Sequence, residues 1–78
     1  GNALVADIQR LPSRMTRDFL RMYRGWLSFI ERAEQALDDP STPPEVVNAI
    51  QQALPQMRRD KAILEGKIEQ LEQFAQSL

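Results

Sequence analysis

The stretch VNAIQQALPQMRRDKAILEGKIEQLEQFAQSL, residues 47–78, decides the fold. Its apolar residues return every three or four positions, the period of an α-helix that lays one stripe against another helix. The spacing therefore predicts a long helix over 44–78 with a coiled-coil seam. The seam consists of Val47, Ile50, Leu54, Met57, Leu64, Ile68, Leu71, Ala75 and Leu78.

Two residues interrupt this seam. Pro55 lacks a backbone N–H and crowds the carbonyl of Gln51, so we expect the long helix to be kinked near Pro55. Lys61 stands where the heptad expects an apolar residue. We expect its stem to lie along the seam with the ammonium in water, and Asp60 and Glu65 are its candidate partners across an interface.

Prolines divide the rest of the chain. Pro12 predicts the end of a short amphipathic helix over 3–11, and a second helix is expected over 13–38. A Pro-rich turn over 39–43 follows. Because this connection is short, the two long helices should run antiparallel.

Residues 42–45 carry a separate signal for the start of the long helix. Thr42 and Glu45 have the spacing of a capping box, and Pro43 would occupy the first helical position. Together these segments predict an all-α fold: an antiparallel, coiled-coil-like helical hairpin with a short N-terminal helix. All of it belongs to a single domain, 1–78, which we expect oligomerisation to complete as a bundle.

Composition limits the chemistry of the chain. Its 78 residues include no cysteine and no histidine, which excludes disulfides, thiol chemistry and the usual zinc sites. No nucleophile and base pair or cofactor motif is recognisable either. We therefore expect no enzyme activity and no catalytic, cofactor-binding or metal site.

The segment 13–38 holds four of the five aromatic residues on a broad apolar stripe, which we expect to supply most of the core. Gly25 lies inside it at a cost of about 1 kcal/mol relative to alanine. The stripe consists of Met15, Phe19, Met22, Tyr23, Trp26, Phe29, Ile30, Ala33 and Leu37. The residues predicted to form the interface are Phe19, Met22, Trp26, Phe29, Ile50, Met57, Leu64, Ile68 and Leu71.

The opposite side of this helix carries a line of four arginines at spacings of three, four and three: Arg14, Arg17, Arg21 and Arg24. Guanidinium groups suit bidentate contacts with phosphate or carboxylate, so this line is a candidate anion-binding surface. A solvated helix exterior explains the same pattern. The aromatic residues lie apart from the arginines, which argues against base stacking.

The order helix, Pro-rich turn and longer helix, with Leu64, Ile68, Leu71 and Phe74 in the last, is similar to two known arrangements. One is the dimerising C-terminal region of PadR-like transcriptional regulators, and the other is the small hairpin co-chaperones of type III secretion needle subunits. A PadR-like protein also has a winged DNA-binding domain, which has no counterpart here. Any paired helix shows the shared pattern, so it assigns no family.

These observations predict a non-enzymatic protein–protein interaction or oligomerisation module that acts through apolar helix faces. A helical adaptor, a co-chaperone and the dimerisation domain of a regulator are members of this class. The partner is expected to be a protein, either a second copy or a different helical chain. The alternative is a small dimeric nucleic-acid-associated regulator that uses the arginine line. We expect no membrane partner and a cytoplasmic location.

Overall fold

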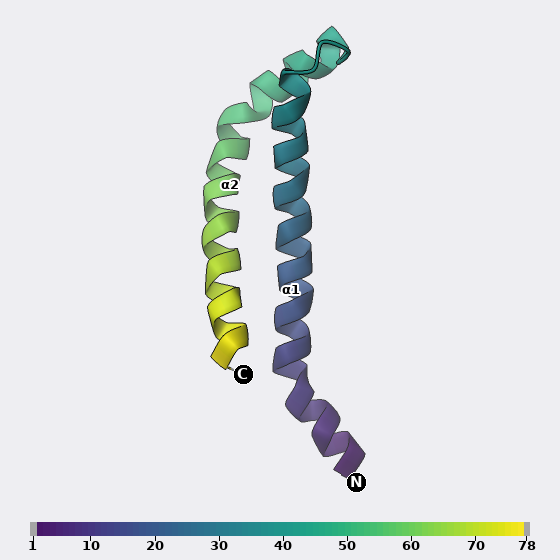
Figure 1. Ribbon diagram of the computed structural model, residues 1–78, viewed down its shortest axis with the longest axis vertical. Coiled ribbons are helices and arrows are strands. Elements are labelled where there is room, and N and C mark those ends of the chain that lie inside the picture. The colour runs from purple at the N-terminus through teal and green to yellow at the C-terminus, as the bar shows by residue number, and fades with distance from the viewer. Residues whose placement is uncertain (1, 78) are drawn as a thin grey trace.

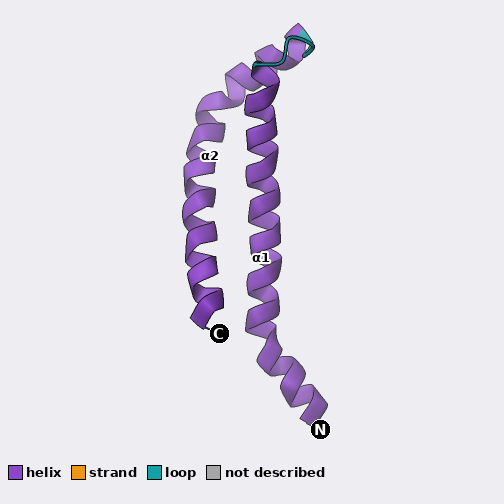
Figure 2. Ribbon diagram, in the orientation of Figure 1, coloured by secondary structure: helices purple, strands orange, loops and turns teal. Residues whose placement is uncertain are grey.

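The computed structural model describes the backbone of residues 2–77 and the side chains of residues 12–77. Helix α1 spans Asn2–Leu37 and helix α2 spans Pro44–Ser77. The two helices run antiparallel, side by side, with one turn between them (Figure 1). Every described residue outside this turn is helical (Figure 2). The structure thus confirms the predicted all-α helical hairpin.

Helix α1 continues through Pro12, where the sequence predicts a break between helices over 3–11 and 13–38. A proline removes one hydrogen-bond donor and bends a helix, but its backbone angle is itself helical, so the ladder can resume one turn later. The buried Thr16 hydroxyl donates to the Pro12 carbonyl at 2.7 Å and closes this turn. Figure 1 shows the first turns of α1 inclined to the rest of the helix. The predicted pair of helices is therefore one bent helix.

Helix α2 contains Pro55 without interruption. Figure 1 shows that its first third, drawn in teal and green, is inclined to the remainder. This bend carries the start of α2 across the end of α1, and the remainder of α2 then runs down beside α1.

The turn differs from the predicted capping box. The Thr42 hydroxyl donates to the Ala36 carbonyl at 2.7 Å, so it closes the end of α1 and does not cap α2. Helix α2 begins at Pro44, one residue later than the box requires, and the Pro43 carbonyl accepts the N–H groups of Val46 and Val47. A threonine this close to both helix ends can hydrogen-bond to either one. Here its hydroxyl bonds to a carbonyl at the end of α1 that has no N–H partner within the helix.

Asp39 holds the turn together. One of its carboxylate oxygens accepts the Ser41 backbone N–H at 2.9 Å and the Ser41 hydroxyl at 2.7 Å. These two hydrogen bonds stabilise the ionised form and lower the pKa of Asp39 below its ordinary value.

The two helices meet along one stripe of each, which we call the inner seam. Its residues alternate spacings of four and three, and every one is buried or half-buried. Ile30 is 1% exposed and Leu64 is 4% exposed. The inner seam consists of Thr16, Leu20, Tyr23, Leu27, Ile30, Glu34 and Leu37 on α1, with Val47, Ile50, Leu54, Met57, Lys61, Leu64, Ile68 and Leu71 on α2.

The hairpin is a single layer. Its principal dimensions are 60 × 20 × 16 Å, and one helix with its side chains is about 10–12 Å thick. Both broad faces of this layer are therefore open to solvent, and only the inner seam between the helices is covered.

We expect Leu64→Ala to lower the free energy of unfolding by about 2–5 kcal/mol, because it opens a cavity in the inner seam. Ile63→Ala is the matched control, since Ile63 is 56% exposed and its truncation should change stability by only about 0.5 kcal/mol. Urea denaturation followed by circular dichroism in dilute solution measures both. Equal losses for the two variants would contradict the assignment of the seam.

The lowered pKa of Asp39 also predicts a pH dependence. Because the folded pKa lies below the unfolded one, the stabilisation is complete above the unfolded value of about 3.9 and is lost as the pH falls through the folded value. Asp39→Asn keeps an acceptor for Ser41 but cannot titrate, so its urea midpoint should fall less steeply than that of the wild type below about pH 4. Asp39→Ala should also lower the midpoint at neutral pH, since it removes the acceptor. Parallel acid profiles for wild type and Asp39→Asn would rule this assignment out.

Candidate functional site

One broad face of the hairpin is lined by apolar side chains, most of them large, that the two helices leave exposed to solvent. On α1 each of them precedes a residue of the inner seam by one position. Trp26 is 52% exposed and Phe29 is 60% exposed. We call this surface the apolar face. It comprises Met15, Phe19, Met22, Trp26 and Phe29 on α1, with Val46, Ala49, Ala53, Ile63 and Phe74 on α2.

Geometry places these residues on one side. A residue one position before the seam is turned by about 100° from it on each helix. Since the helices are antiparallel, the two rotations bring these positions to the same side of the hairpin. The residues that follow the seam by one position lie on the opposite side of the hairpin.

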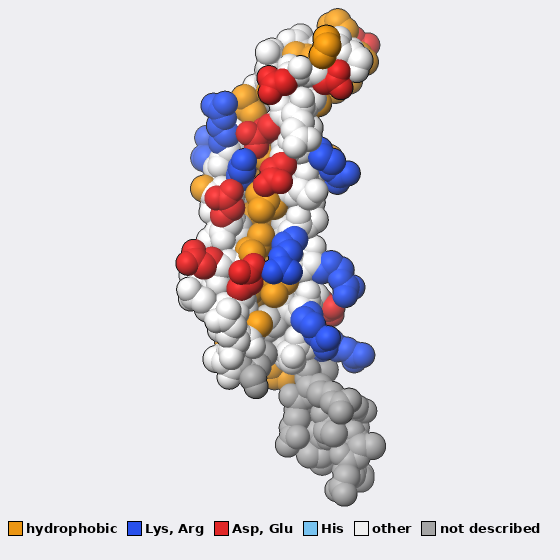
Figure 3. Space-filling view, viewed as in Figure 1, with side chains coloured by type: hydrophobic (Ala, Val, Ile, Leu, Met, Phe, Trp, Pro, Cys, Tyr) orange, Lys and Arg blue, Asp and Glu red, His pale blue; other side chains and the backbone are white. Residues whose placement is uncertain are grey.

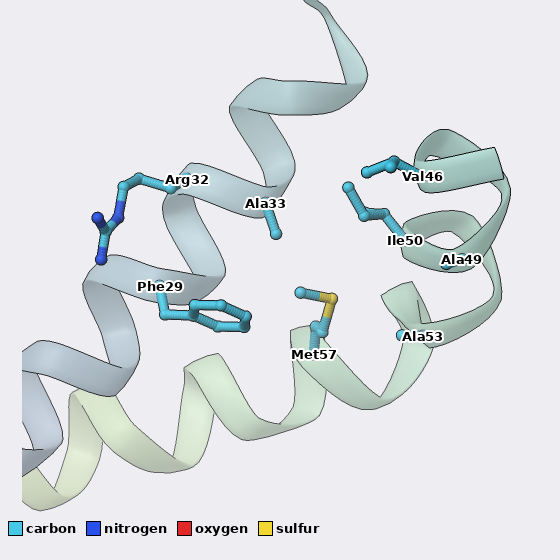
Figure 4. A pocket seen from close by; sticks show the side chains of 8 residues that line it. All are labelled: Phe29, Arg32, Ala33, Val46, Ala49, Ile50, Ala53 and Met57. Carbon is cyan, nitrogen blue, oxygen red and sulfur yellow. The ribbon is translucent and has the colours of Figure 1, made fainter. Parts of the chain in front are cut away.

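A cavity of about 570 Å³ opens on the apolar face near the turn. Figure 4 shows Phe29 and Ala33 of α1 pointing toward Ile50 and Met57 of α2, while Arg32 points away. Ala49 and Ala53 form part of the α2 wall, and their small side chains leave the hollow open.

A second hollow of about 400 Å³ lies toward the open end of the hairpin. Phe19 and Tyr23 of α1 and Phe74 of α2 form its apolar walls, and Lys67 and Gln70 supply polar ones. The Phe19 and Tyr23 rings stack with centroids 6.2 Å apart, which helps to hold Phe19 in place on the surface. The apolar face thus extends over both halves of the hairpin.

The opposite face is polar. Figure 3 shows a face of the hairpin on which acidic and basic side chains of both helices border a narrow hydrophobic strip. Arg24 and Glu72 form an ion pair across the helices at 2.8 Å, with each side chain about half exposed. The predicted anion-binding residues Arg14, Arg17, Arg21 and Arg24 are all exposed on α1.

Lys61 occupies the inner seam opposite an acid that the sequence did not single out. Its ammonium donates to Glu34 at 3.2 Å, and each side chain is about one-third exposed. The hydrogen bond to Glu34 and the charge of that carboxylate raise the pKa of Lys61, with smaller contributions from Glu31 and Glu65. Glu34 lies on α1, so the partner is found across the hairpin, whereas Asp60 and Glu65 were the expected partners.

The structure divides the predicted interface residues into two groups. Ile50, Met57, Leu64, Ile68 and Leu71 lie on the inner seam and pack within the hairpin. Phe19, Met22, Trp26 and Phe29 lie on the apolar face instead of forming the expected core.

Four α1 residues of the inner seam were missed: Thr16, Leu20, Leu27 and Glu34. Their spacing was available in the sequence. However, two apolar stripes only one residue apart merge into a single broad one, and periodicity alone cannot show which of them faces α2.

Other kinds of site find little support in the described residues. Residues 12–77 bring no three acidic, histidine or cysteine side chains into a group that could hold a metal ion. Across the same part of the chain, neither helix is apolar over a stretch long enough to cross a bilayer. Comparisons with known proteins find no match to a family model, to a curated protein or to a solved structure. The two resemblances noted from the helix order gain no support from them.

We expect dilute protein to bind the apolar dye anilinonaphthalene sulfonate through the cavity near the turn. Ala53→Lys places a charge in the wall of that cavity and should reduce dye fluorescence severalfold without loss of helicity. Ala62→Lys is the matched control, because Ala62 is equally a surface alanine of α2 but follows the seam on the polar face. Equal dye signals from the two variants would show that the cavity does not bind it.

Proposed function

We propose that this chain is a non-enzymatic protein–protein interaction or oligomerisation module, and that the apolar face is its working surface. The distribution of large apolar side chains carries the proposal. Eight of them are exposed among the described residues, whereas only Leu20, Ile30 and Leu64 are buried. Monomeric proteins rarely leave a contiguous apolar patch of this kind uncovered.

The energetics point the same way. Burying one large apolar side chain contributes about 1.5–3 kcal/mol, so covering even half of the exposed set would be a large gain for a small domain. A chain of 78 residues without disulfides obtains only a few kcal/mol from a core of its own. Association would bury the exposed apolar side chains and so add the stability that a single layer of two helices lacks.

A helical adaptor, a co-chaperone and a regulator's dimerisation domain all use surfaces of this type, and we keep the proposal at the level of the class. The alternative is a dimeric nucleic-acid-associated regulator that binds phosphates through the arginine line. One of its residues, Arg24, is paired with Glu72. Glu65 and Glu69 follow the seam on the same polar face and add further negative charge beside the arginines. The large side chains of the apolar face remain exposed within the hairpin, so the interaction module is the better supported function.

Phe29→Glu tests the proposal. We expect wild-type protein to associate as its concentration rises, and the variant to associate at least about tenfold more weakly, because a charge replaces a buried ring. Light scattering across a concentration series reports mass, and emission from Trp26, the single tryptophan, reports directly on the apolar face. Both measurements are made at low and high salt.

Ser28→Glu is the control, since it adds the same charge on the polar side of α1 and should leave association unchanged. Association through apolar surface varies little with salt, whereas phosphate binding by arginines falls steeply. The proposal is wrong if Phe29→Glu leaves both the mass and the Trp26 emission as in the wild type.

A further inference from the structure

We infer that a second copy of this chain covers the apolar face, with its α1 antiparallel to the first α1 about a twofold axis that crosses the apolar stripe at the level of residue 24. This rests on the proposed function and specifies its partner. The result is a four-helix bundle of two hairpins, in which each α1 contacts α2 along the inner seam and the second α1 along the apolar face.

The symmetry of the exposed α1 stripe supports this register. Met22 and Trp26 lie two residues on either side of position 24, Phe19 and Phe29 lie five residues away, and Met15 and Ala33 lie nine residues away. When two such helices run antiparallel with residue 24 at the axis, Met22 of one faces Trp26 of the other. Phe19 likewise faces Phe29, and Met15 faces Ala33. Every layer of the contact is apolar on both sides.

The same register fills the cavity near the turn. Ala33 and Phe29 form its α1 wall (Figure 4). Met15 of the second copy lies opposite Ala33, over the mouth of this cavity. Methionine is flexible and suits an irregular hollow of this kind.

Charges at the edge of the stripe select the antiparallel direction. Asp18, Gly25 and Arg32 recur at intervals of seven, directly before stripe residues, on the edge away from α2. Flanking positions of this kind meet between paired helices and set their orientation. In the antiparallel register Asp18 of one copy meets Arg32 of the other, and the twofold axis repeats this pair.

A parallel pairing loses the Asp18–Arg32 pair and its symmetry mate. Asp18 of one copy would then approach Tyr23 of the other, and Arg32 would approach Leu37. Gly25 meets its own copy at the centre of the antiparallel contact. The hairpin itself gives no reason for this glycine, since a Cβ there would meet nothing within 4 Å.

Packing of whole hairpins agrees with this direction. Two hairpins stacked face to face by a twofold axis have two arrangements. An axis parallel to the helices sets α1 on α2 of the other copy, where Asp60 and Lys67 interrupt the apolar positions of α2. An axis perpendicular to the helices sets α1 on α1, antiparallel, and joins the two fully apolar stripes.

Disulfide trapping tests the register directly, because the chain has no cysteine of its own. Asp18→Cys and Arg32→Cys are prepared separately and oxidised alone and as an equal mixture. We expect a cross-linked dimer in the mixture and little in either single sample, since residue 18 of one copy lies about 21 Å from residue 18 of the other. Glu31→Cys, on the polar face, should not cross-link with either variant.

A charge exchange provides the second test. Asp18→Arg and Arg32→Asp should each weaken the dimer about tenfold in sedimentation equilibrium, and the double variant should return to within about twofold of the wild type. Residues 18 and 32 lie about 21 Å apart on one helix, so no contact within a hairpin can explain this rescue. Circular dichroism checks that helicity is unchanged.

Each remaining outcome overturns the inference. Cross-links within the single samples would indicate parallel helices. A dimer that shields Trp26 but shows neither mixed cross-link nor rescue would refute this register and leave the proposed function in place. A helical monomer whose Trp26 stays exposed at all concentrations would refute both.

Discussion

Two helices lying side by side can bury only the stripe that each turns toward the other, and this constraint shapes the molecule. Helix α1 carries two apolar stripes separated by about 100°, and α2 can cover only one of them. The covered stripe contains Leu20 and Ile30, and the uncovered one contains Trp26 and Phe29. Phe19, Trp26 and Phe29 therefore lie where a further helix would pack, as the inward stripes of a four-helix bundle do.

The pair of Glu34 and Lys61 limits how the two helices slide past each other. Apolar residues of the inner seam could exchange neighbours after a shift of one turn, because most are similar in size and shape. A shift of that kind would separate the Lys61 ammonium from the Glu34 carboxylate and break their ion pair on the seam. The turn, held by Asp39 and Thr42, limits the same movement at the closed end.

Local signals predicted much of this fold. The period from Val47 to Leu71 predicted the face of α2 that packs on α1, because the positions that follow this stripe are mostly polar. On α1 the apolar positions cover nearly half the circumference, so the core stripe and the exposed stripe could not be separated without knowing where α2 lies. The helix end predicted at Pro12 was wrong for another reason. A single missing hydrogen-bond donor bends a helix without ending it when the residues on both sides favour helix.

Sequence distance between paired residues grows steadily away from the turn. Lys61 and Glu34 are 27 residues apart in the chain, while Arg24 and Glu72 are 48 apart. Closing a longer loop costs more entropy, so the hairpin should form first beside the turn and zip toward its open end. Amide protons near the open end would then exchange with solvent soonest, since this end can fray while the closed end remains paired.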